Sequence, residues 1–192
     1  MSVGYWETLS TVASDGTAVT ATARTSLLSS GAKTGLYTMA PNRLKIGDVL
    51  HIRAAGRISC TVTTPGTARF DLSWGVGGTA GFDSLAISLN TTAQTNVPWV
   101  LDAEMIVRAN GSSGNLFGLG FWLSAAGLNV ATVSTGPGPG GAVIPYNTAP
   151  VVGSTVDMSI AQILDFNFTQ TVATGSITLH NYVLSLKTSS GF

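Results

Sequence analysis

Few residues of this chain could carry out acid–base or metal chemistry, and the closest pair is Asp102 and Glu104. They stand two positions apart in a run that alternates apolar and polar residues, so in a strand both carboxylates project from one face. Such a pair could hold Ca²⁺ or divide the acid and base roles of a glycosidase. Because Arg108 is expected on the same face and Arg53 on a comparable one, cross-strand ion pairs are favoured. We therefore expect no metal site and no catalytic site here.

The two histidines and the single cysteine also favour structural roles. His51 lies on the polar face of an alternating run, which predicts a cross-strand hydrogen-bonding partner. The same role is expected for His180, with a place at a subunit interface as the alternative. Cys60 alternates with polar residues and is predicted to be a small buried residue. No nucleophile elbow, zinc-protease motif or phosphate-binding loop is present, so we expect neither an enzyme nor a cofactor.

The four tryptophans allow two interpretations. Exposed indole rings could stack on sugars as in a lectin, whereas buried ones supply core or subunit-contact energy. Three of the four, Trp74, Trp99 and Trp122, fall in alternating runs, and the fourth is Trp6. The pattern favours core or contact residues over sugar binding.

Charge is scarce, and this restricts the class of protein. Only 9% of residues are charged, nine basic against nine acidic, where soluble domains average about 25%. Because 44% of residues are hydrophobic, the chain should fold rather than remain disordered. No basic cluster is available to neutralise phosphates, which argues against nucleic-acid binding. A surface with so few charges, above all between Ala109 and Val156, is expected to be covered by further copies of the chain.

Targeting signals are also missing from the pattern. The segment Met1 to Thr11 has no basic region followed by an apolar core, so we expect synthesis in a cytoplasm without a secretory signal. The uncharged run from Leu116 to Val133 is long enough to span a membrane. Glycines interrupt it and its first half alternates as a strand does, so we expect no membrane association.

Period-two alternation separated by Gly, Pro and Asn predicts an all-β protein. The clearest strand is Val97 to Ala109, and Val49 to Val62 alternates similarly with a bulge or bend expected at Gly56. Further strands are expected near residues 70–76, 85–89, 116–123, 164–168 and 177–186. About eight antiparallel strands at this spacing predict a β-sandwich of the jelly-roll type. The expected organisation is an N-terminal arm or edge-strand region, 1–40, followed by a single sandwich domain, 41–192.

Two uncharged segments and the arm are expected to make contacts between subunits. From Leu116 to Leu123 both faces of the strand are apolar or small, so both could be covered. Gly136 to Gly141 reads Gly-Pro-Gly-Pro-Gly-Gly and predicts a long loop that continues through Pro145 and Pro150. The segment from Thr17 to Ser30 is expected to be an arm or edge strand that lies on a neighbour. The candidate interface residues are Leu116, Phe117, Leu119, Phe121, Val143, Ile144 and Tyr146.

Three segments of the chain resemble virion structural proteins of tailed bacteriophages: Pro41 to Ser59, Leu89 to Trp99, and Ile177 to Leu184. The resemblance implies a small jelly-roll or β-sandwich module that assembles on the particle and offers no catalytic residues. The resemblance implies a place on the virion, either on the capsid shell or on the tail. We expect a capsid decoration or accessory protein, with the major capsid protein or other virion proteins as partners. We expect a homotrimer, because closed cyclic symmetry stops assembly at a discrete cap. The alternative is a tail-associated or host-glycan-binding module.

Overall fold

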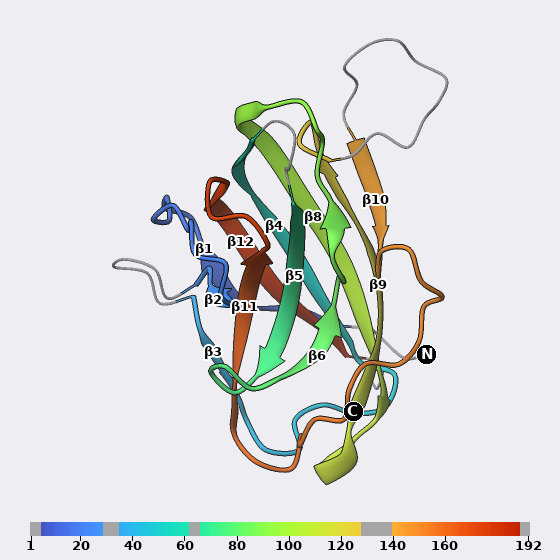
Figure 1. Ribbon diagram of the computed structural model, residues 1–192. Helices are drawn as coiled ribbons and strands as arrows, with labels where there is room; N and C mark the ends of the chain where they lie inside the picture. The colour runs from blue at the N-terminus through green and yellow to red at the C-terminus, as the bar shows by residue number, and fades with distance from the viewer. Residues whose placement is uncertain (1–4, 29–34, 62–65, 128–139, 189–192) are drawn as a thin grey trace.

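The computed structural model describes residues 5–28, 35–61, 66–127 and 140–188, and these form two antiparallel sheets packed face to face (Figure 1). The strands are β1 (Tyr5–Val12), β2 (Thr25–Ser26), β3 (Tyr37–Met39), β4 (Val49–Cys60), β5 (Thr67–Trp74), β6 (Thr79–Asp83), β7 (Ile87–Ser88), β8 (Gln94–Ala109), β9 (Asn115–Ser124), β10 (Gly140–Ile144), β11 (Gln162–Gln170) and β12 (Ser176–Thr188). One 3-10 turn, Gly111–Ser113, joins β8 to β9. Among the described residues no helix has the length and apolarity needed to cross a membrane.

The strand order is that of a jelly roll with an extension. Sheet A has the order β1-β12-β4-β8-β9-β10 and sheet B the order β2-β11-β5-β6, with β3 pairing β11 and β7 pairing β5. With β3, β7, β9 and β10 set aside, eight framework strands remain, and in chain order they run 1-8-3-6 in one sheet and 2-7-4-5 in the other. Two Greek keys interlock in this way in jelly rolls. The predicted fold class is therefore confirmed, and β9 and β10 widen sheet A beyond it.

Alternation in the sequence explains the layers. In β8, Leu101 and Met105 point into the core and Asp102 and Glu104 point outward, as predicted. The predicted irregularity at Gly56 is also present, because the register of β12 against β4 shifts between Leu179 and Asn181, next to this glycine. A Cβ at Gly56 would lie 1.9 Å from the carbonyl oxygen of Thr178, so no other residue fits there without movement of the backbone.

Aromatic side chains fill the space between the sheets. The Phe70 ring lies 5.3 Å from the rings of both Trp99 and Phe168, measured between centroids. Trp74, Trp99 and Trp122 are buried, as is Cys60, which confirms their predicted place in the core. Three of the four tryptophans are therefore not accessible for stacking on a sugar.

The N-terminal region packs on its own chain, so the described part of Thr17 to Ser30 lies at sheet edges and is not a free arm, and its contact with a neighbour stays a prediction. Val19 bridges to Ile177, and β2 pairs with β11. Leu27 and Leu28 are fully buried. The weak alternation of this segment arises because it crosses from the edge of one sheet to the edge of the other. Ser29 and Ser30 lie outside the described residues.

Part of the predicted Gly/Pro-rich loop is a strand. Residues 136–139 lie outside the described residues, but Gly140 and Gly141 begin β10, which pairs with β9 from Gly140↔Ser124 to Ile144↔Gly120. A Cβ at Gly140 would lie 2.4 Å from the carbonyl oxygen of Gly127. Here glycine permits close packing of two backbones. Composition alone does not distinguish glycines in such a strand from glycines in a loop. The segment from Pro145 to Pro150 is a loop, as expected.

Candidate interaction surface

An exposed apolar stripe runs along β9 on the outer face of sheet A. Leu119 is 45% exposed, Phe121 42% and Leu123 45%, and Phe117 beside them is half-buried. We call these four side chains, with the flanking Val143 of β10 and Val152, the β9 stripe. Val143 stands opposite Phe121 in the β10–β9 pairing, and Val152 bridges to Phe117.

The inner face of β9 explains why the stripe must point outward. Leu116 and Trp122 are buried between the sheets, and Gly118 and Gly120 alternate with them. A Cβ at Gly118 would lie 2.2 Å from the ring of Phe82, so the core leaves no room for a side chain there. The sequence predicted that both faces of this strand could be covered, and the chain itself covers only one.

The stripe is large for a protein of this size. Five of its members are 42% to 67% exposed and Phe117 is half-buried, which amounts to on the order of 500 Å² of apolar area. The largest apolar patch on a typical monomer measures about 300–600 Å² and often has a function. Two shallow hollows lie between the stripe and β8. One, of about 440 Å³, is lined by Asp102, Glu104, Leu119, Gly120, Phe121 and Val143; the other, of about 300 Å³, by Val49, Glu104, Ile106, Arg108, Phe117 and Leu119.

The structure corrects part of the candidate interface list. Leu116 and Ile144 are fully buried because their side chains face the core, so they have no surface to offer a partner. Tyr146 is half-buried and packs against the core, and its backbone N–H donates to the carbonyl oxygen of Ser84. The other four residues, Phe117, Leu119, Phe121 and Val143, face outward. Contact with a partner stays a prediction for these four.

Beside the stripe, the polar side chains form fewer ion pairs than expected. His51 Nε2 and Asp102 Oδ1 lie 2.9 Å apart, which confirms the predicted cross-strand partner of this histidine. Arg53 and Glu104 make no ion pair with any described residue, and Arg108 lies over the Phe117 ring, 4.7 Å from its centroid. The expected ion pairs of Asp102 and Glu104 with arginines are therefore wrong, because Asp102 binds His51 instead. Within residues 5–28, 35–61, 66–127 and 140–188, no group of three His, Cys, Asp or Glu side chains could hold a metal ion.

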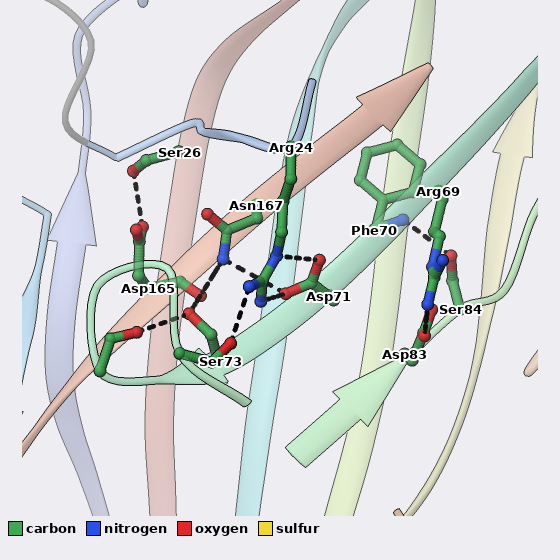
Figure 2. A network of polar contacts seen from close by, with 12 residues as sticks. Arg24, Ser26, Arg69, Phe70, Asp71, Ser73, Asp83, Ser84, Asp165 and Asn167 are labelled. Carbon is green, nitrogen blue, oxygen red and sulfur yellow. Dashed lines mark hydrogen bonds and ion pairs between the residues drawn. The ribbon is translucent and has the colours of Figure 1, made fainter. Parts of the chain in front are cut away.

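A second polar cluster, on sheet B, joins β2 and the residues before it to β5 and β11 (Figure 2). The guanidinium of Arg24 donates from Nε to Asp71 at 2.9 Å and from Nη2 to the same carboxylate, and Nη1 donates to the carbonyl oxygen of Gly78 at 2.7 Å. Asn167 Nδ2 donates to Asp71 at 3.2 Å and to Ser73 at 3.0 Å. Asp71 is almost completely buried, so this cluster fastens the N-terminal segment to the sheet.

Asp165 lies at the edge of this cluster and is also buried. Ser26 Oγ donates to its carboxylate at 2.6 Å. Burial raises the pKa of Asp165 above its ordinary value, and the negative charge of Asp71 adds to that rise, although the hydrogen bond from Ser26 opposes it. Sequence reasoning missed this cluster because its bonds join distant segments, with 47 positions between Arg24 and Asp71 and 139 between Ser26 and Asp165, and no local motif marks them.

Comparison with known proteins leaves the family open. No protein-family model matches the chain, and no curated protein matches it. Among solved structures, the CBM2 module of an evolved Dit protein from Lactobacillus casei BL23 phage J-1 aligns over 82% of this chain and 70% of that chain. The identity is 9% and the TM-score 0.29, a likeness too low to transfer a function to this chain.

Proposed function

We propose that this chain is a non-enzymatic structural protein of a tailed-bacteriophage virion, most simply a capsid decoration or accessory protein. In this proposal it assembles with copies of itself through the outer face of sheet A, and the homotrimer is the expected state. The β9 stripe is the observation that carries the proposal. The placement on a phage particle is supported by the resemblance of three sequence segments to virion proteins.

The energetics favour apolar association over electrostatic steering. At about 25 cal/mol per Å², covering about 500 Å² of apolar surface on each copy contributes on the order of 12 kcal/mol per copy. Association costs on the order of 4–15 kcal/mol in lost motion, whereas an exposed ion pair contributes about 0–1 kcal/mol. A standard interface covers about 800 Å² per partner, so the stripe would form the centre of a larger contact.

Light scattering coupled to size-exclusion chromatography tests the self-association. We expect the wild-type chain to be oligomeric and the Leu119→Asp/Phe121→Asp variant to be monomeric, since each Asp would have to be buried without a partner. The matched control is Val76→Asp/Ile160→Asp, which removes two exposed apolar side chains away from the stripe. A monomeric wild-type chain, or a stripe variant that assembles as well as the control, would contradict the proposal. Co-sedimentation of the same three proteins with particles lacking this chain tests the virion role.

Trp6 is the observation that favours a second candidate, a tail-associated or host-glycan-binding module. It is 49% exposed on the outer face of sheet A, and its ring packs edge-on at 5.9 Å from the ring of His51. Lys187 Nζ lies 5.6 Å from the Trp6 ring centroid and occupies space that a sugar would need. Binding on a glycan array that is lost in Trp6→Ala and retained in Leu119→Asp/Phe121→Asp would favour this candidate.

A further inference from the structure

Nearly every charged side chain that the structure describes has a partner within the chain. All nine acidic residues lie in the described ranges, and eight of them form an ion pair or hydrogen bond: Glu7, Asp15, Asp48, Asp71, Asp83, Asp102, Asp157 and Asp165. Glu104 is the ninth, and no described residue bonds to it. Among the described basic residues, Arg53 and Arg57 lack a partner, whereas the others make ion pairs, hydrogen bonds or contacts with aromatic rings: Arg24, Arg43, Lys45, Arg69, Arg108 and Lys187.

The three described charges without a partner all project from the outer face of sheet A. Arg53 and Arg57 belong to β4 and Glu104 to β8, and all three are exposed. Arg53 stands opposite Asp102, but the carboxylate of Asp102 is held by His51, which itself stands opposite Glu104. Arg53 and Glu104 are therefore diagonal neighbours on adjacent strands, a separation of about 7–8 Å between their backbones.

Two of these charges lie beside the β9 stripe. Glu104 stands opposite Leu119, and Glu104 lines both hollows between β8 and β9. Arg53 shares a row across the sheet with Phe121, through Asp102. Arg57 instead stands opposite Pro98, beyond the end of the β8–β9 pairing, which runs from Trp99 to Ala109. A partner that covers the stripe would thus bury Glu104 and Arg53, whereas Arg57 lies farther from the stripe and is expected to stay in contact with water.

Burial of an unpaired charge is costly, so whatever covers the stripe must supply the opposite charges. A second copy of this chain supplies both, because the same face carries one free carboxylate and one free guanidinium next to the same apolar side chains. With a two-fold axis between Arg53 and Glu104, Arg53 of each copy lies over Glu104 of the other copy. In a cyclic ring, each interface between neighbouring copies can form one such pair.

We propose that Glu104 of one copy forms an ion pair with Arg53 of a neighbouring copy, and that this pair sets the register in which the two β9 stripes are covered. The inference rests on the proposed self-association and names its partner. The guanidinium presents two parallel N–H groups to a carboxylate, which fixes geometry as well as charge. The apolar contact supplies affinity, and the charge pair excludes registers in which like charges meet.

Charge reversal tests the pair. Sedimentation velocity over a range of concentrations is measured for wild type, Glu104→Arg, Arg53→Glu, the double variant carrying both changes, and Arg57→Glu as the control. Each single reversal is expected to raise the dissociation constant about 30-fold or more, the effect of losing one partner of a buried pair. The double variant should associate like wild type. An equimolar mixture of the two single variants should form mixed dimers, because each then supplies the charge that the other lacks, and a pair within one chain could not be restored by mixing. A ring of three made from the mixture would always keep one interface between like charges, so mixing should not restore a trimer.

The outcomes separate the two proposals. A monomeric wild type would remove both. A wild type that assembles through the stripe, with single reversals that associate normally or a mixture that forms no mixed dimers, overturns the Arg53–Glu104 pair and leaves the proposed self-association intact. If Arg57→Glu, and not Arg53→Glu, restores association to Glu104→Arg, the assignment to Arg53 is wrong. Thermal melts of all variants check that these exposed substitutions leave the fold unchanged.

Discussion

Removal of the Arg24 guanidinium is expected to destabilise the fold far more than removal of a similar one nearby. In Arg24→Met the side chain keeps its apolar length, but Asp71 loses the guanidinium donors that hold its carboxylate. Among the described residues Asn167 is then its one remaining side-chain donor. The matched control is Arg69→Met, because Arg69 forms the same two-pronged pair with Asp83 on the same sheet.

The two pairs differ in burial, and the difference sets the expected magnitudes. The Arg24 and Asp71 side chains are 29% and 4% exposed, and those of Arg69 and Asp83 are 47% and 21% exposed. Breaking a buried pair from one side costs about 3–5 kcal/mol, and the partial exposure of Arg24 reduces this to about 2–3 kcal/mol. Arg69→Met should cost about 0–1 kcal/mol, as exposed pairs do. For a domain of this length, the Arg24 variant should melt about 5–10 °C lower.

Urea unfolding followed by tryptophan fluorescence measures both free energies, since three tryptophans are buried in the core. The double variant Arg24→Met/Asp71→Asn should recover part of the loss, because it leaves no uncompensated buried charge. Equal losses in Arg24→Met and Arg69→Met would refute the reasoning, since burial would then not be what makes the Arg24 pair important.

Two further predictions concern Asp165 and Gly56. Burial raises the pKa of Asp165 in the folded state, so the folded protein favours the protonated carboxyl over the ionised one. The stability that the protonated form contributes is lost as pH rises through the folded-state pKa. Asp165→Asn should therefore unfold at higher urea than wild type at pH 7, with the gap closing as pH falls toward the ordinary value of 3.8, and a gap independent of pH would contradict the assignment. Gly56→Ala places a Cβ 1.9 Å from the carbonyl oxygen of Thr178 and should cost about 3 kcal/mol by urea unfolding, whereas Ala55→Gly, one residue earlier in the same strand, should cost about 1 kcal/mol or less.

Alternation in the sequence predicted the strands and their two faces because the period of two follows directly from strand geometry. It assigned Trp99, Trp122 and Cys60 to the core, and the regular spacing of the strands indicated the jelly roll. Local alternation predicted the strands correctly wherever one face of the strand packs on the core and the other faces solvent.

Features that depend on distant segments could not be predicted in this way. Alternation showed that β9 has two apolar faces, but not that the sandwich covers only the face with Trp122. The glycines of β10 indicated a loop, although contact with Gly127 makes them part of a sheet. The Arg24–Asp71 pair and the lone Glu104 emerge only when strands from different parts of the chain are placed side by side.

Glycine on the inner side of β9 has a consequence for the kinetics of the proposed self-association. The Phe82 ring fills the space beneath Gly118, so the backbone of β9 packs directly against the core. The outward side chains of β9 are therefore held in place before any partner binds. A partner would then encounter a surface already in its final shape, and little freedom would be lost on docking. Growth of an assembly would in that case follow protein concentration alone, with no slow rearrangement to delay it.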